Sequence, residues 1–365
     1  MPRGRRSMKV PKNIAKQVIG WYSKHRRPLP WRRTRDPYAI WISEVMLQQT
    51  QVQTTIPYYR RFLSRFPNVE TLAKADLQDV LKTWENMGYY SRARHAHEAA
   101  KRIVDQHGGK IPATMDALCS LPGIGPYIAS AILCFAFGRR IATVEANVSR
   151  VLCRLNGIQT PMERASTRKR LFEMATAMVP ASNPDLFNQG LMDLGATVCT
   201  PRGPACGRCP VAGHCQALKS RIQEMLPMKK KRAPLPHRRM TAAIIRDRKR
   251  RVLIVQRPPE GLLGGLWKFP GGECGAGESL DGALKRIVGE ELGIRIRIQQ
   301  PLPSVEHTYT HFRTTLYGFR CSRVGEPGAS GCYRWTWAEE SMLEDFPFSR
   351  VDRKLMDAIP PGIFN

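Results

Sequence analysis

Carboxylates are scarce in this sequence of 365 residues, and none occurs before Asp36. Lysine and arginine total 58 against 30 aspartate and glutamate, which gives a formal net charge of +28. Such an excess favours a polyanionic partner, either nucleic acid or an anionic membrane surface, and says nothing about the fold. The basic residues 1–10, taken alone, are equally compatible with a solvated tail that aids solubility.

Long hydrophobic runs are also lacking. The longest apolar run, residues 128–137, is about half as long as the ~20 residues that a membrane-spanning helix needs. The basic N-terminus is not followed by the apolar core of a signal peptide, and lysines and prolines interrupt it too often for a transit peptide. We therefore expect a cytoplasmic protein that does not enter a membrane.

Cysteine is present but unevenly distributed. Of ten cysteines, four crowd into the pattern Cys199-x6-Cys206-x2-Cys209-x5-Cys215. A disulfide framework would spread its cysteines more evenly, so the pattern indicates a metal site in a reducing compartment. Zinc and an iron–sulfur cluster are the two candidates. Structural zinc sites usually pair two short knuckles, whereas only one is present here, and we therefore favour a [4Fe–4S] cluster that orders a basic loop for DNA binding.

The period of the apolar residues changes along the chain. Spacings of three and four up to about residue 216 predict helices, and the lysine-rich and proline-rich residues 219–239 are typical of an extended linker. Beyond residue 240 the period is two, with strands at 241–246 and 251–257 forming a hairpin, further strands at 295–298, 314–319 and 333–337, and one helix at about 279–292. We predict a helical domain (1–218), a linker (219–239) and an α+β domain (240–365).

A glycine-rich turn interrupts the helical part at Leu121-Pro-Gly-Ile-Gly-Pro-Tyr-Ile-Ala129. Gly123 and Gly125 allow the backbone to approach another surface closely, and Pro126 suits the first position of a following helix, whose free N–H groups attract anions. The alternative is an ordinary link between two helices. Within so basic a chain, we interpret residues 118–136 as a helix-hairpin-helix element that grips DNA phosphates.

Residues 36–51 predict one helix with an apolar face and a polar face. Glu44, Gln48 and Gln51 share the polar face at positions i, i+4 and i+7. A carboxylate at the edge of the apolar face can have a raised pKa and serve as a general acid, although a solvated polar face has the same spacing.

Several motifs together resemble the adenine DNA glycosylases of the MutY family. They are Leu29-Pro-Trp-Arg32, Ser43-Glu-Val-Met-Leu-Gln-Gln-Thr50, residues 84–92, the glycine-rich turn, Phe187-Asn-Gln-Gly190, Asp193-Leu-Gly-Ala196 and the cysteine pattern. The resemblance spans most of residues 15–216. It implies removal of adenine mispaired with 8-oxoguanine or guanine in double-stranded DNA. We expect a monomer that associates with the bacterial nucleoid through DNA.

The resemblance also implies roles for individual residues. Glu44 aligns with the acid that protonates adenine, and Tyr127 and Asn147 align with pocket residues. Gln49 and Tyr89 align with side chains that wedge into the duplex when the base is flipped out of the stack. Arg32, Gln48 and Gln189 fall in motifs that imply further DNA contacts.

Two positions qualify the resemblance. Bifunctional relatives carry a nucleophilic lysine where this chain has Tyr127, and no lysine occurs between Lys110 and Lys169, so we expect no lyase activity. The family pattern Val-Asp-Gly-Asn-Val appears as Val144-Glu145-Ala146-Asn147-Val148, which lengthens by one methylene the carboxylate that stabilises the cationic sugar.

The second domain contains a Nudix box from Gly272 to Ile294 in which Ile287 replaces one metal-binding glutamate. This replacement argues against nucleotide hydrolysis and leaves only Glu290 and Glu291 on that helix face. The domain resembles the MutT-like reader of 8-oxoguanine in the MutY family, with a recognition loop at residues 307–312 that includes Thr310 and His311.

We interpret the sequence as an adenine DNA glycosylase with a helical core, an iron–sulfur loop and a mispair-reading domain. Two alternatives remain open. One is a pyrimidine glycosylase/lyase similar to endonuclease III, and the other is a damage-binding protein whose chemistry is weakened at Glu145.

Overall fold

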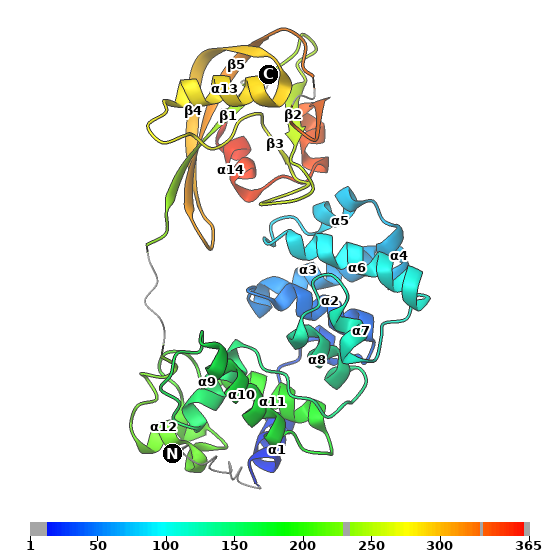
Figure 1. Ribbon diagram of the computed structural model, residues 1–365, viewed down its shortest axis with the longest axis vertical. Helices are drawn as coiled ribbons and strands as arrows, with labels where there is room; N and C mark the ends of the chain where they lie inside the picture. Colours follow the sequence, from blue (N-terminus) through cyan, green and yellow to red (C-terminus); the bar gives the residue numbers. More distant parts are fainter. Residues whose placement is uncertain (1–12, 229–233, 329–330, 361–365) are drawn as a thin grey trace, which may run out of the picture. The chain divides into compact units, whose positions relative to one another are not determined.

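The computed structural model describes residues 13–228, 234–328 and 331–360 (Figure 1). One unit combines Met1–Glu70 with Glu98–Arg232, and a second combines Thr71–His97 with Ala233–Asn365. The tail expected at residues 1–10 and residues 229–233 of the expected linker lie outside the described residues. The domain boundaries drawn from the sequence stay a prediction.

The described part of the first unit is helical. Its elements are α1 (Ile14–His25), η1 (Pro30–Arg32), α2 (Pro37–Leu47), α3 (Val52–Arg65), α7 (Met115–Cys119), α8 (Pro126–Phe135), α9 (Ala146–Leu155), α10 (Ala165–Met178), α11 (Pro184–Thr197), η2 (Cys206–Arg208), η3 (Ala212–His214) and α12 (Gln216–Lys219). Helices α4 (Val69–Lys74) and α6 (Ser91–His107) cross from one unit to the other, and α5 (Leu77–Thr83) belongs to the second.

Helix α11 packs against both α1 and α9 in the core of the first unit. The crossing of α9 and α11 is close because Gly195 has no side chain: a Cβ there would lie 2.6 Å from the Cβ of Asn147. This contact fixes the first turn of α9, which carries Asn147.

The apolar run noted in the sequence is a core helix. Every residue of α8 from Ile128 to Phe135 is buried, and the helix packs against α2. Among the described residues, no helix has the length and apolarity that a membrane span requires. The predicted hairpin is confirmed, since α7 and α8 flank the glycine-rich turn and Pro126 is the first residue of α8.

The single helix expected over residues 36–51 is wrong in its length. Asp36 caps α2 by accepting hydrogen bonds from the backbone N–H groups of Tyr38 and Ala39, but the helix ends at Leu47. The backbone turns at Gln49, whose φ of 57° is left-handed, and α3 begins at Val52. Glu44, Gln48 and Gln51 therefore do not share one helix face.

The second unit contains two sheets of three strands, in the orders β1-β5-β4 and β3-β2-β6. The strands are β1 (His237–Ile245), β2 (Val252–Gln256), β3 (Trp267–Lys268), β4 (Arg295–Thr308), β5 (Arg313–Val324) and β6 (Arg334–Ala338). Helix α13 (Leu280–Leu292) packs on β1 and β4, and α14 (Arg350–Ala358) packs on β4 and β5. The helix expected at 279–292 is confirmed: Ser279 caps it, and Gly293, with φ of 68°, ends it.

The hairpin expected between residues 241–246 and 251–257 is wrong. Strand β1 pairs in parallel with β5, whereas β2 pairs with β3 and β6, and only an isolated bridge between Arg246 and Val252 joins their ends. Alternate residues in the second half of β1 enter two different cores, so this half of the strand is buried on both faces. A short apolar run that is buried on both faces is compatible with parallel pairing to a strand distant in the sequence.

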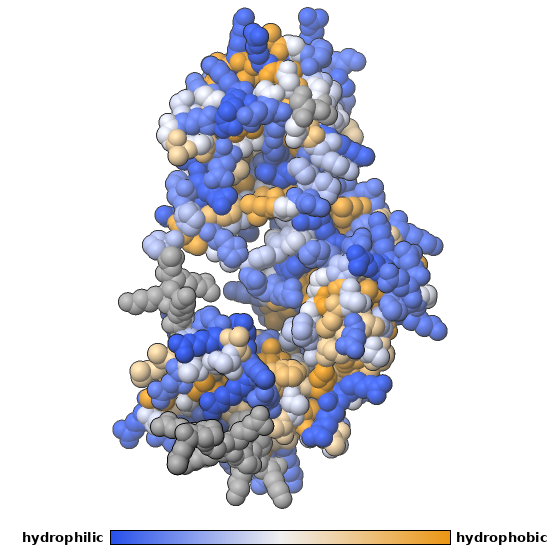
Figure 2. All heavy atoms as spheres, viewed as in Figure 1, coloured by the Kyte–Doolittle hydropathy of each residue, from blue (hydrophilic) through white to orange (hydrophobic). Residues whose placement is uncertain are grey.

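The surface is largely polar. On the face drawn in Figure 2, hydrophilic residues cover most of the surface and apolar residues form smaller patches.

Candidate active site and iron–sulfur loop

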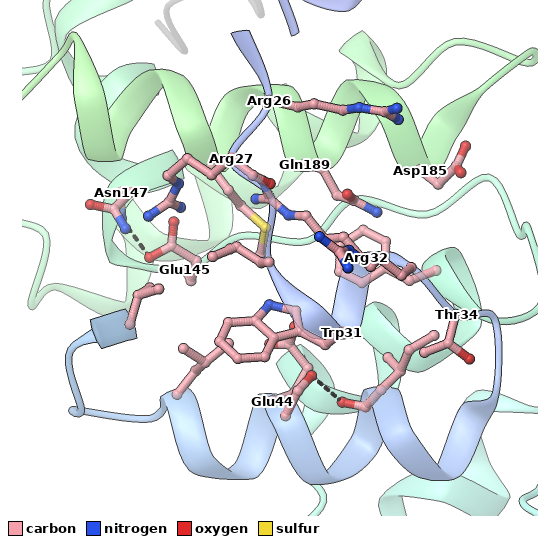
Figure 3. Close-up of a pocket in the computed structure, with 18 of the residues that line it drawn as sticks. Arg26, Arg27, Trp31, Arg32, Thr34, Glu44, Glu145, Asn147, Asp185 and Gln189 are labelled. Atoms are coloured by element: carbon pink, nitrogen blue, oxygen red, sulfur yellow. Dashed lines mark hydrogen bonds between the residues drawn. The ribbon is translucent and has the colours of Figure 1, made fainter. Parts of the chain in front are cut away.

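A cavity of about 1040 Å³ lies within the first unit. Eight of the residues singled out in the sequence line it, although they come from distant segments: Arg32, Glu44, Gln48, Gln49, Tyr127, Glu145, Asn147 and Gln189. Figure 3 shows Glu44 on one wall and Glu145 with Asn147 on another, with Trp31 between them. Sequence reasoning did not single out Trp31 as a site residue, because a buried tryptophan beside a proline reads as core.

Glu44 is the buried acid of this cavity. Only 5% of the residue is exposed, and the phenol of Tyr127 donates a hydrogen bond to its Oε2 at 2.7 Å. Burial raises the pKa of Glu44 to about 7, the Tyr127 hydrogen bond opposes this rise, and the charge of Glu145 adds to it. A carboxyl group with this pKa is partly protonated at neutral pH and can donate a proton there. The expectation of a raised pKa is confirmed.

Tyr127 remains a donor because burial and the nearby carboxylates raise its own pKa well above the ordinary value. It is the second residue of α8, directly after Pro126, so the hairpin itself places the phenol against Glu44.

Glu145 caps the N-terminus of α9. Its carboxylate accepts hydrogen bonds from the backbone N–H of Asn147 at 2.7 Å and of Val148 at 2.9 Å. Burial raises the pKa of Glu145, and these hydrogen bonds work against the rise. The longer side chain thus folds back onto its own helix while still lining the cavity.

Asn147 and Gln189 are held in fixed orientations. Arg150 donates from Nη2 to Oδ1 of Asn147 at 2.6 Å, and the hydroxyl of Tyr22 donates to Oε1 of Gln189 at 2.5 Å. Both amides are therefore preorganised at the cavity wall.

Arg32 makes an ion pair that the sequence did not reveal. Its Nη1 and Nη2 donate to the two carboxylate oxygens of Asp193 at 2.6 and 2.8 Å, and Arg27 binds the same carboxylate. The side chain of Asp193 is fully buried. Burial opposes its ionisation, but the hydrogen bonds and charges of Arg32 and Arg27 outweigh that effect and hold its pKa below the usual value. Asp193 begins the motif Asp193-Leu-Gly-Ala196, but nothing in the sequence pattern showed that Arg27 and Arg32 are its partners.

The glycine-rich turn has the backbone expected of an anion grip. Gly123 has φ of 73°, and Gly125 precedes α8 without any side-chain cap on the first N–H groups. Those groups point out of the helix start, where a phosphate oxygen can accept them.

The four clustered cysteines occupy a loop without a regular helix, from Cys199 after α11 to Cys215 before α12. Burial raises the pKa of Cys209 to about 11, and the charges of the other three thiols add to the rise. No three cysteine, histidine or acidic side chains within the described ranges are close enough to share a single metal ion.

Arg154 is a buried residue that contacts the cysteine loop. It is 1% exposed, and its Nη1 lies 3.4 Å from Sγ of Cys199 and donates to the Thr200 carbonyl at 2.6 Å. Its guanidinium brings a buried positive charge to a site where four thiolates would gather.

Tyr89, Thr310 and His311 lie in the second unit. Thr310 and His311 form the tip between β4 and β5, and both are exposed. The hydroxyls of Tyr89 and Thr310 are hydrogen-bonded to each other. Tyr89 has φ of 50°, an uncommon conformation for a residue with a side chain.

The Nudix box of the second unit lacks a set of carboxylates that could bind a metal ion. Ile287 is buried, Glu278 and Glu290 both pair with Arg286, and Glu291 pairs with Lys268. Glu278, Glu290 and Glu291 thus each have a protein cation as partner. The absence of nucleotide hydrolysis stays a prediction.

Comparisons with known proteins identify families for three regions of the chain. Residues 42–174 match the HhH-GPD superfamily of base excision DNA repair proteins, residues 199–215 match the iron–sulfur binding domain of endonuclease III, and residues 241–358 match the NUDIX domain. The chain is 34% identical to an adenine DNA glycosylase of Homo sapiens, over 88% of this chain and 70% of that protein. It is 39% identical to an adenine DNA glycosylase of Buchnera aphidicola, over 59% of this chain and 62% of that protein.

Solved structures resemble the helical part. The structure of a thermostable thymine-DNA glycosylase aligns with a TM-score of 0.53 and 32% identity, over 57% of this chain and 96% of that one. An endonuclease III–DNA complex aligns with a TM-score of 0.50 at 20% identity, over 57% of this chain and 95% of that one, and indicates the shared fold alone.

Proposed function

We propose that this chain, which belongs to the adenine DNA glycosylase family, excises adenine opposite 8-oxoguanine or guanine after flipping it into the cavity lined by Glu44. The chain is thus a DNA-binding N-glycosylase of base excision repair that carries a [4Fe–4S] cluster. The observation that carries the proposal is the buried Glu44 with its raised pKa and its hydrogen bond from Tyr127.

Glu44 acts as the general acid. It donates its proton to a ring nitrogen of adenine, the bond between the sugar and the base breaks, and its electron pair leaves with adenine. Glu145 then faces the cationic sugar with a carboxylate held by the start of α9. Water adds to the sugar and its extra proton passes to the surrounding water, which leaves an abasic site. Tyr127 stands where a Schiff-base lysine would be needed, so the strand is not cut.

The DNA contacts are assigned as follows. Backbone N–H groups of the hairpin at Gly123 and Gly125 hold a phosphate, and Gln48 and Gln49 project from the turn between α2 and α3 toward the base stack. Tyr89, Thr310 and His311 read the base opposite adenine. Arg32 acts mainly through its ion pair with Asp193.

Cys199, Cys206, Cys209 and Cys215 are the proposed ligands of the cluster. The group orders the basic loop when bound, and Arg154 offsets part of the negative charge of its ligands. The protein acts as a monomer.

A panel of duplexes tests this function. Single-turnover assays would compare adenine opposite 8-oxoguanine, adenine opposite guanine and thymine opposite guanine, with gels run before and after alkali. We expect base release from the two adenine duplexes and strand breaks only after alkali. Release of thymine instead would favour the activity named for the thermostable relative, strand breaks without alkali would favour a lyase, and binding without release would favour a damage-binding protein.

A further inference from the structure

A buried carboxylate joins two distant segments of the second unit. Glu85 follows α5 and is 8% exposed. Its Oε1 accepts hydrogen bonds from the backbone N–H of Phe348 at 3.1 Å and from Nε of Arg353 at 2.8 Å. Its Oε2 accepts from Lys82 at 2.6 Å. Both carboxylate oxygens are therefore used, one of them entirely by residues more than 260 positions away.

Arg353 is held equally firmly on the other side. Its Nη1 donates to the Leu343 carbonyl at 3.0 Å, its Nη2 donates to the Phe346 carbonyl at 2.6 Å, and its guanidinium lies 5.0 Å from the centre of the Phe348 ring. These contacts fix the planar guanidinium of Arg353 independently of Glu85. A lysine at this position could not reproduce them.

Further polar contacts join residues 78–94 to the residues near β3. Trp267 donates from Nε1 to Oε1 of Gln78 at 3.0 Å, and Gln78 donates back to the Gly265 carbonyl at 3.2 Å. Arg94 donates to the Gly264 carbonyl at 2.7 Å. Residues 78–94 are therefore bound to the β-rich part of the unit by specific side-chain contacts.

The same segment carries Tyr89. Between Glu85 and Tyr89 the chain forms a tight loop, in which Nε1 of Trp84 donates to the Gly88 carbonyl at 3.0 Å. The hydroxyl of Tyr90 binds the Phe348 carbonyl at 3.3 Å, directly beside the site where Glu85 binds the Phe348 N–H. Glu85 and Tyr90 therefore attach both ends of the loop that presents Tyr89 to Thr310.

We propose that the Glu85–Arg353 ion pair is the anchor that fixes the Tyr89 loop relative to Thr310, and that it sets how strongly the enzyme prefers 8-oxoguanine over guanine opposite adenine. This inference rests on the proposed function. Neither residue touches the base: both are positioning residues that hold two reading side chains in one rigid body. Loss of the anchor leaves both readers present but lets their separation vary.

The test uses full-length Glu85→Gln and Arg353→Met, with Glu98→Gln as a control because Glu98 forms an exposed ion pair with Arg102 on α6. The ratio of single-turnover rates for 8-oxoguanine and guanine duplexes should fall by about tenfold or more in the first two variants, because truncating a buried charge pair leaves its partner unpaired. The control should keep the ratio of the unchanged protein. In the charge-reversed double variant, Glu85→Arg with Arg353→Glu, the rate ratio should stay below that of the unchanged protein. The reason is that a glutamate at position 353 cannot donate to the Leu343 and Phe346 carbonyls.

Hydrogen exchange supplies the second readout. In Arg353→Met, segments 84–94 and 343–353 should lose protection together, while α8 and α9 keep theirs and the thermal melt stays cooperative. Unchanged exchange in these segments would overturn the anchor, and altered exchange with an unchanged rate ratio would overturn its role in specificity. If the unmodified protein itself shows no preference for 8-oxoguanine, the proposed function fails, and the exchange measurement still decides whether the anchor exists.

Discussion

The Tyr127 hydroxyl donates to Oε2 of Glu44 across 2.7 Å, and this contact joins the first turn of the hairpin helix to the buried acid of the cavity. The two residues are 83 positions apart in sequence. The helix that follows the glycine-rich turn thus carries, as its second residue, the side chain that lowers the pKa of an acid that burial has raised.

The pH dependence of adenine release follows from this contact. Only protonated Glu44 can donate, so the single-turnover rate should fall as pH rises through about 7. In Tyr127→Phe the opposing hydrogen bond is lost, so the pKa should rise and the alkaline limb of the profile should move to higher pH. Tyr333→Phe, at an exposed tyrosine, is the control. A shift of the Tyr127→Phe profile to lower pH would refute this view of the contact.

Glu145 should be essential to the chemical step. Glu145→Gln removes the negative charge facing the cationic sugar, and we expect a loss on the order of 3 kcal/mol of transition-state stabilisation, or at least about a hundredfold in rate. Glu145→Asp restores the length usual in the family but gives up reach to the N–H groups of Asn147 and Val148, so its rate should change while mismatch affinity stays nearly constant. Near-normal cleavage by Glu145→Gln would mean that another group stabilises the sugar.

Asp193 should contribute strongly to stability. Replacing it with asparagine leaves Arg27 and Arg32 without their buried counter-charge, which should cost about 3 kcal/mol or more in the free energy of unfolding. Its pKa is lower in the folded than in the unfolded chain, so this contribution is present at neutral pH and is lost as pH falls below about 4. Urea unfolding at several pH values measures both effects, with Glu98→Gln as an exposed control. A loss equal to that of the control would contradict the assignment.

The cysteine loop should carry about four irons per chain after anaerobic purification, with the brown colour of a [4Fe–4S] cluster. Cys209→Ser should lose iron and colour, whereas Cys119→Ser, at an exposed cysteine outside the loop, should keep both. A colourless protein with one zinc per chain would show that the cluster assignment is wrong.

The sequence was sufficient to predict features that depend on residues close together in the chain. The cysteine spacing, the turn at Gly123 and Gly125, and the helix from Leu280 to Leu292 each depend on residues close together in the chain. The raised pKa of Glu44 was also foreseeable, because a carboxylate on the flank of an apolar helix becomes buried when that helix packs.

The features that could not be predicted from the sequence depend mainly on contacts between distant residues. Asp193 binds arginines more than 160 positions away, and Glu85 binds Arg353 across 268 positions. Helix α2 ends at Leu47 because the backbone makes a left-handed turn at Gln49. Such a turn is usually recognised in a sequence by a glycine, and none is present there. Strand β1 pairs with β5 rather than with β2, the next strand in the sequence, and side chains on both of its faces are buried.

The most direct test of the central claim compares Glu44→Gln with the unchanged protein on a duplex containing adenine opposite 8-oxoguanine. Glutamine keeps the shape of the side chain but cannot supply the proton, and the basic surface that binds DNA is untouched. We expect adenine release to be abolished in single turnover while duplex affinity, measured by fluorescence anisotropy, is retained. Release within about tenfold of the unchanged rate would contradict the account, because a different acid would then protonate the base.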